Sequence, residues 1–226
     1  MVPLGVEGDS TTAPPCFECR APCCAGPAVS LLPYDLYRLV RALGVPWQLL
    51  AHADEVADGP VALDDRRRVD FRLRQQAGGC VLLLQLSSGH GRCGAHAARP
   101  GRCRIYPFHV EVYRRSADYD VVVGLGAACP PDPAAQWAGL VRAEASRDLI
   151  DDEIAEQALT RKVMERWELA RRAAPMTLDA RHFVAFCERI YAILDGVRRG
   201  PRMLWQLDAY QVVDAFPVTM PSLLAS

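Results

Sequence analysis

The cysteines of this chain gather in its first half, and this grouping constrains the fold more than any other sequence feature. Eight of the nine cysteines lie within the first 129 residues. Four of them stand within nine positions: Cys16, Cys19, Cys23 and Cys24. A Cys-x-x-Cys pair lets one tight loop direct two thiolates at one metal, and clustered thiolates are ligands for zinc or an iron–sulfur cluster. The sequence therefore predicts a metal site in the first half.

The number of metal sites stays open at this level. The other four thiols of this half come singly, each near a predicted turn or strand end: Cys80, Cys93, Cys103 and Cys129. Neighbouring side chains of an extended chain point to opposite sides, so Cys23 and Cys24 do not easily bind one tetrahedral metal. Eight thiols fit either two four-thiolate sites or one cluster with spare thiols. Cys187 lies on an apolar helical stripe, where we expect a small buried hydrophobe.

Charge and composition exclude several classes of function. The net charge is −1, so no overall field favours nucleic acid or an acidic membrane surface. Lys162 is the only lysine, which leaves one candidate for lysine chemistry. The first residues resemble no signal peptide, and no apolar run approaches the roughly 18 residues of a membrane span. We expect a cytoplasmic protein with reduced thiols, which disfavours disulfides.

The first half is predicted to be α+β, with a small, largely antiparallel sheet. We expect a flexible leader over 1–15 and a cysteine-rich metal-binding domain over 16–130. A helix opens at Ser30–Asp35 and ends at Gly44, a short helix follows at 46–50, and an acidic stretch at 52–65 reads as a surface loop. Alternating or apolar runs predict a largely antiparallel sheet with strands at 69–73, 80–86, 110–113 and 119–124.

Residues 131–226 are predicted to form a helical extension packed on the metal-binding domain. Three helices are indicated by apolar stripes: Trp137, Leu140 and Val141; Ile150, Ile154, Leu159, Val163, Trp167 and Leu169; Phe183, Phe186, Ile190, Ile193, Leu194 and Val197. Asp151–Glu153 reads as a solvated helix start. We expect Trp137 and the Phe183 stripe to pack on the sheet or to close a homodimer, and the helical half to offer a surface to a protein partner or substrate.

A second group of residues surrounds Cys93 and Cys103. Arg99, Arg102 and Arg104 crowd these thiols, and nearby cations lower the pKa of a thiol and favour the thiolate that binds metal. The alternative is that the arginines are simply solvated. His96 follows Cys93 by three residues, and it serves either as a nitrogen ligand or as a capping or supporting group.

A Gly-x-Gly pair, Gly124 and Gly126, follows the last predicted strand. Such a pair can cradle a phosphate or a nucleotide-type cofactor. The simpler alternative is a turn that delivers Cys129 to the metal. Candidate cofactor contacts are therefore Arg99, Arg104, Gly124 and Gly126. The chain has no phosphate-binding P-loop, no nucleophile elbow and no zinc-protease motif.

Taken together, these motifs resemble a bacterial family described as a zinc- or iron-chelating domain, named after a Cys-x-x-Cys-x(2,3)-Cys-Cys motif. Four blocks carry the resemblance: Cys16/Cys19/Cys23/Cys24, Leu32–Leu39, Gly79–Leu83, and Cys93…Arg99-Pro100…Cys103-Arg104-Ile105-Tyr106-Pro107-Phe108. They cover residues 16–129.

The resemblance implies an iron–sulfur cluster, since members of this family are commonly described as containing one. We favour one four-iron cluster bound through several of Cys16, Cys19, Cys23, Cys24, Cys80, Cys93, Cys103 and Cys129. The protein would then be a cluster-dependent enzyme or a redox or accessory protein. A zinc-stabilised interaction module is the alternative. The family also includes flagellin lysine N-methylases, which adds protein lysine N-methylation as a weaker alternative.

Overall fold

A computed structural model gives the fold of the chain. It describes residues 24, 26, 28–76, 79–87, 91–105, 108–115, 118–125, 143–197 and 202–217, and within these ranges only the backbone of 108–150 and 202–207. The strands are β1 Ala51–Glu55, β2 Val61–Ala62, β3 Arg68–Leu73, β4 Gln75–Gln76, β5 Gly79–Cys80, β6 Leu83–Gln85, β7 Gly91–Cys93, β8 Phe108–Arg115 and β9 Asp118–Leu125. The helices are α3 Pro33–Leu43, α4 Trp47–Leu50, η1 His96–Ala98 (a 3₁₀ turn), α5 Gly101–Ile105, α7 Ala143–Ala173, α8 Ala180–Val197 and α9 Arg202–Ala215.

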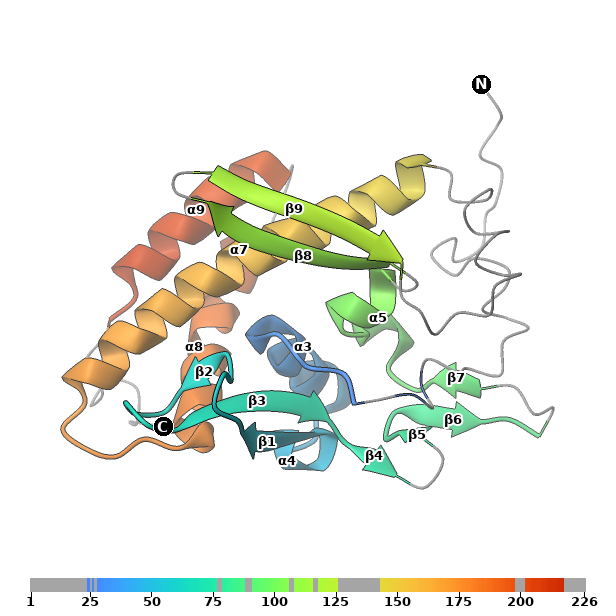
Figure 1. Cartoon of the computed structure of the whole chain (residues 1–226), viewed down its shortest axis with the longest axis horizontal. Helices are drawn as coiled ribbons and strands as arrows, with labels where there is room; N and C mark the ends of the chain where they lie inside the picture. Colours follow the sequence, from blue (N-terminus) through green and yellow to red (C-terminus); the bar gives the residue numbers. More distant parts are fainter. Residues whose placement is uncertain are drawn as a thin grey trace.

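Antiparallel strands dominate the first half and long helices the second, which confirms the α+β class (Figure 1). The larger sheet has the order β1-β3-β2, with β3 in the centre. Three two-stranded sheets follow along the chain, β4-β5, β6-β7 and β8-β9. The strands predicted at 69–73, 110–113 and 119–124 are present as β3, β8 and β9. The strand predicted at 80–86 is divided by a turn at 81–82 into β5 and β6.

The stretch 52–65 is only partly the predicted surface loop, because it contains most of β1 and all of β2. Ala51–Glu55 pairs with β3 from Leu73 back to Val69, and Val61–Ala62 pairs with the start of β3. Gly59 lies so close to β3 that a Cβ there would come within 2.8 Å of the Val69 backbone. Polar residues and a Gly-Pro pair obscured these pairings, because the strands obtain their stability from β3 rather than from local propensity.

Helix α3 is the helix that the sequence predicted to end at Gly44. Pro33 stands at its first position, where the missing N–H costs nothing. Asp35 accepts a hydrogen bond from the backbone N–H of Leu32 at 3.2 Å, which satisfies one donor at the helix start. Gly44 adopts φ 64° and donates its N–H to the Val40 carbonyl at 2.9 Å. This left-handed cap favours glycine, so local sequence signals set both ends of α3.

Residues from both halves of the chain contribute to one aromatic core. The rings of Phe71 (β3) and Phe183 (α8) stack with centroids 5.5 Å apart, and Trp167 (α7) meets Phe183 edge-on at 5.2 Å. The predicted contact between the Phe183 stripe and the sheet is therefore present. Trp137 lies outside the described residues, and the domain boundary at 131 stays a prediction.

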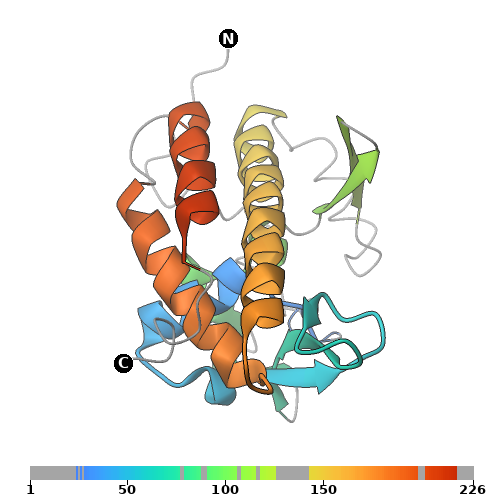
Figure 2. The same cartoon turned by 90° about the vertical axis from the view of Figure 1, so that its left-hand side faces the viewer.

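Helices α7, α8 and α9 lie side by side in the second half (Figure 2). Two predicted core residues on these helices are instead exposed, Leu169 at 52% and Ile193 at 49%. The acidic start predicted at Asp151–Glu153 is also wrong, because α7 already begins at Ala143 and Glu153 is only 1% exposed. Among the described residues, no helix is long and apolar enough to cross a membrane.

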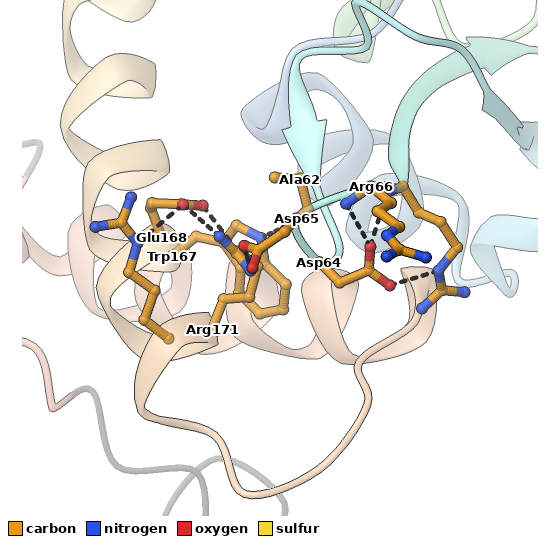
Figure 3. A network of polar contacts seen from close by, with 9 residues as sticks. Ala62, Asp64, Asp65, Arg66, Trp167, Glu168 and Arg171 are labelled. Atoms are coloured by element: carbon orange, nitrogen blue, oxygen red, sulfur yellow. Dashed lines mark hydrogen bonds and ion pairs between the residues drawn. The ribbon is translucent and has the colours of Figure 1, made fainter.

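A polar network attaches α7 to the turn between β2 and β3 (Figure 3). The indole N–H of Trp167 donates to the Ala62 carbonyl at 2.7 Å. Arg171 donates to Glu168 at 2.6 Å and to Asp65 at 3.0 Å. Within the turn, hydrogen bonds from Arg67 and from neighbouring backbone N–H groups lower the pKa of Asp64 to about 2. The turn is thus held in one conformation where it meets the helical half.

Candidate metal centre

The structure describes four of the eight cysteines predicted to bind metal. All four are partly buried: Cys24, Cys80, Cys93 and Cys103. The other four lie outside the described residues: Cys16, Cys19, Cys23 and Cys129. Cys187 is only 1% exposed, and burial raises the pKa of its thiol well above the ordinary value, as expected for a core residue rather than a ligand.

The β4-β5 hairpin brings the segments of Cys24 and Cys80 together. Gln75 and Cys80 are partners in the antiparallel register. The Gln75 side chain also donates to the carbonyl of Gly26 at 2.5 Å, two residues after Cys24. Gly79 adopts φ 139°, which an L side chain rarely tolerates. This conformation explains a glycine directly before Cys80 in the motif.

The β6-β7 hairpin adds the segment of Cys93. Cys93 is the register partner of Leu83, and the Gly94 N–H donates to the Leu82 carbonyl at 2.7 Å. The Leu82 N–H in turn points at Cys80 and donates to its Sγ at 3.4 Å. Hydrogen bonds made by the Leu82 backbone therefore link the Cys80 sulfur to the segment of Cys93. Cys80 and Cys93 lie in two neighbouring short hairpins, and the segment of Cys24 is linked to the first of them through Gln75.

Cys103 lies on α5, the short helix that follows β7 and the turn η1 along the chain (Figure 1). Its N–H donates to the Pro100 carbonyl at 2.9 Å, as does that of Arg104 at 3.0 Å. Pro100 thus starts the turn that carries the thiol. The residues just before and after Pro100 contact α3: Gly101 N–H donates to Asp35 Oδ1 at 2.9 Å, and Arg38 donates to the Arg99 carbonyl.

The donor chemistry of these segments fits a thiolate-bound metal. A hydrogen bond from a backbone N–H to sulfur stabilises the thiolate, and such bonds also tune the potential of iron–sulfur clusters. Partial burial keeps water from competing fully for the ligands. Within the described residues, no group of three or more His, Cys, Asp or Glu side chains is arranged to hold a metal. Half of the predicted thiols are outside those residues, including the Cys16–Cys23 part of the motif.

The other candidate residues have more varied surroundings. Arg99 donates from Nε to the His96 carbonyl at 3.2 Å, so it braces the turn η1 before Pro100. Gly124 lies in β9 opposite His109 of β8. Gly126 is outside the described residues. The proposed roles of Arg99, Arg104, Gly124 and Gly126 as cofactor contacts stay predictions.

A group of buried and partly buried charges, which we call the junction cluster, lies where α3, α5 and α7 meet. Its members are Asp35, Arg38, Arg104 and Glu153. Burial raises the pKa of Asp35, against hydrogen bonds from Gly101 and Leu32 and the charge of Arg38. Burial and the nearby charge of Asp35 raise the pKa of Glu153. Burial and the charge of Arg104 lower the pKa of Arg38. Arg104 therefore faces this cluster and is not a simple solvated charge.

Sequence reasoning did not find the junction cluster. A usable signal was present in α7, because Glu153, Glu156 and Thr160 continue the helical spacing of Val163, Trp167 and Ala170. All six are buried. A carboxylate on the apolar stripe of a helix indicates a buried polar contact, since burying an unpaired charge is costly. The partner of that contact could not be read from the spacing.

Comparison with known families agrees with this geometry. Residues 15–122 match the family described as "putative zinc- or iron-chelating domain". Over these residues the chain is similar to that family, which supports metal binding without deciding between zinc and iron. No curated protein and no solved structure matches the chain. The matched residues include β1 to β8 and α3 to α5, but end before α7.

Proposed function

We propose that this chain is an iron–sulfur protein, with one four-iron cluster held by thiolates from the first half. The observation that carries the proposal is that hairpin pairings and hydrogen bonds link the segments of Cys24, Cys80 and Cys93, which are separated in the sequence. Strands of two or three residues bury little apolar surface of their own. A bound metal would supply the missing stabilisation.

Iron–sulfur is favoured over zinc by the charged surroundings of Cys103. Arg99, Arg102 and Arg104 bracket this thiol in the sequence, and positive charge near it would suit an anionic iron–sulfur cluster. Net charge, hydrogen bonds to sulfur and solvent exposure are the properties that set a cluster's reduction potential.

When bound, a four-iron cluster supplies one-electron redox chemistry. The residues of the chain hold and tune it. Cys24, Cys80, Cys93 and Cys103 are the ligand candidates with described surroundings, and Leu82 contributes a backbone donor to the Cys80 sulfur. The helical half remains a candidate surface for a protein partner or substrate. The protein would act as a redox or accessory protein, or as an enzyme whose chemistry is that of the cluster.

The test is anaerobic purification followed by iron, sulfide and zinc analysis with a visible spectrum. We expect brown protein with broad absorption at about 400 nm, from charge transfer between sulfur and iron. Cys80→Ser, Cys93→Ser and Cys103→Ser should each lower the iron content. Cys187→Ala is the matched control, because it removes a thiol that lies in the core.

Two outcomes would contradict the proposal in different ways. Colourless protein with stoichiometric zinc and no iron, from iron-replete anaerobic cells, would make it a zinc-stabilised module. Iron lost from Cys187→Ala but retained in Cys80→Ser would show that the ligands are misassigned.

A further inference from the structure

The segment that carries Cys103 is held in place from two sides by charged side chains. On one side is α3. Asp35, 2% exposed, accepts a hydrogen bond from the Gly101 N–H at 2.9 Å, and Arg38 donates to the carbonyl of Arg99. The same Arg38 forms an ion pair with Asp35 at 3.4 Å. These contacts hold the backbone on both sides of Pro100, where the turn carrying Cys103 begins.

On the other side is α7, which contributes Glu153. A Cβ placed on Gly101 would lie 1.9 Å from Glu153 Oε2 and 2.8 Å from its carboxyl carbon. The carboxylate therefore occupies the space that any other residue at 101 would need. Oε1 of Glu153 accepts a hydrogen bond from Gln157 at 3.1 Å, which keeps the side chain directed at α5.

The burial of Glu153 is energetically unfavourable, which is unusual for a residue that only fills space. It is 1% exposed, and among the described residues its Oε2 has no hydrogen-bond partner. Burying a polar atom without a partner is destabilising, and an apolar side chain would avoid that cost. The carboxylate lies instead directly against the backbone of the metal-site segment, beside Asp35 and Arg104.

We propose that Asp35 and Glu153 are positioning residues for the Cys103 ligand, one from each side of Gly101. Asp35 fixes the backbone by accepting the Gly101 N–H, and Glu153 sets how closely α5 approaches α7. This inference rests on the proposed metal site. It also extends the site beyond the family domain, because Glu153 lies outside residues 15–122. A helix of the second half thus helps to determine the geometry of a ligand in the first.

The central test is a clash and its relief at residue 101. Gly101→Ala introduces a Cβ into the Glu153 carboxylate, so α5 must shift. Glu153→Ala in the same chain removes the obstructing atoms. The matched control is Gly196→Ala on α8, where an added Cβ meets nothing within 4 Å. For each variant, retained iron per chain and the visible spectrum are followed during an EDTA titration of the anaerobic protein. Far-UV circular dichroism verifies folding.

We expect Gly101→Ala to lose iron to EDTA at about 10- to 100-fold lower chelator concentration, the usual effect of disturbing a residue that supports a metal ligand. Gly101→Ala/Glu153→Ala should recover most of this loss. Gly196→Ala should match the wild type. A spectrum unchanged by Gly101→Ala, with iron retention within twofold of Gly196→Ala, would overturn the proposal. Failure of the double variant to recover would remove Glu153 from it.

Asp35 is tested with a conservative and a disruptive change. Asp35→Asn keeps an oxygen that can accept the Gly101 N–H, whereas Asp35→Leu removes it. Iron retention and the visible spectrum should depend on this acceptor oxygen. Asp35→Asn should retain nearly as much iron as the wild type, and Asp35→Leu should retain much less. Equal loss in both would overturn the role of Asp35. Wild-type protein without metal, or Cys103→Ser with full metal, would instead refute the proposed site itself.

Discussion

The cysteine-bearing hairpins and the aromatic core differ in what stabilises them. Strands β4 to β7 are two or three residues long. Leu84 in β6 is 54% exposed, and Leu86, just after β6, is 40% exposed. In the core, Trp167 and Phe183 are fully buried and pack with Phe71. The aromatic core is stabilised by extensive apolar burial. The hairpins share in that burial only through Leu82 and the partly buried Cys80, Val81 and Cys93, so a bound metal would add proportionally more to their stability.

This contrast indicates which region a bound metal would stabilise. Isolated two-stranded hairpins are at best marginally stable in water. A metal held by thiolates converts binding energy into folding energy. The hairpins should therefore depend on the metal and the core should not, although the junction cluster connects them. The predictions below test how far the two regions are independent.

Removal of the metal should have the largest effect, confined to the hairpins. Structural metal binding in small thiolate sites contributes on the order of 10 kcal/mol to folding. We expect amide protons of β4 to β7 to exchange at nearly unfolded rates after chelation under reducing conditions, while α7 and α8 stay protected. Hydrogen exchange with mass spectrometry measures both. Loss of protection in all of these elements together would mean one core built around the metal.

Trp167→Ala should be the most damaging single change in the core. It removes a fully buried ring and its 2.7 Å hydrogen bond to Ala62, with an expected cost of about 3–5 kcal/mol in unfolding free energy. Urea denaturation measures this cost. Trp47→Ala, at a partly buried ring that meets Phe71 edge-on, is the control and should cost clearly less. Equal losses of unfolding free energy in the two variants would mean that Trp167 is no more important to the core than Trp47.

Cys187→Ala should separate the two kinds of cysteine. The change trims a small buried group and should cost about 1 kcal/mol, without altering metal content. Metal analysis and urea denaturation on the same preparation give both values. A variant that folds normally but loses metal would place Cys187 in the metal site and break the distinction between the regions.

The smallest effect is expected at the start of α8. Asp179 accepts backbone N–H groups from Arg181 at 2.9 Å and His182 at 3.2 Å. Burial raises the pKa of Asp179, but its hydrogen bonds outweigh this and lower the pKa from 3.8 to about 2. A depressed carboxyl pKa stabilises the fold above the unfolded value, and this contribution disappears as pH falls through the folded value.

Asp179→Ala should therefore cost up to about 1 kcal/mol at neutral pH, a typical loss for a helix cap. The difference between variant and wild type should shrink as the pH falls from about 4 towards 2. Urea denaturation across that range, on metal-free protein, measures it. A difference that does not change with pH would mean that the carboxylate charge contributes nothing.

Local signals predicted the elements that depend on nearby residues. The left-handed Gly44 and Pro33 marked the ends of α3, and the alternation of Val69, Phe71 and Leu73 marked β3. The strand Ala51–Glu55 was missed because its stability depends on pairing with β3 across the fold. Ile193 was assigned to the core by its spacing, yet it is 49% exposed on α8 in the part of the chain that the structure describes.

The amino-acid sequence by itself determined that thiols would be gathered in the first half, that α3 and β3 would form, and that Cys187 would behave as a core residue. These properties follow from residue chemistry and from contacts within a few positions. Only the tertiary structure decided that Glu153 would be buried against Gly101, that Arg38 would hold Arg99, and that Phe183 would stack on Phe71. Each of these contacts joins residues more than 50 positions apart, and their free energy arises from burial that exists only when the whole chain has folded.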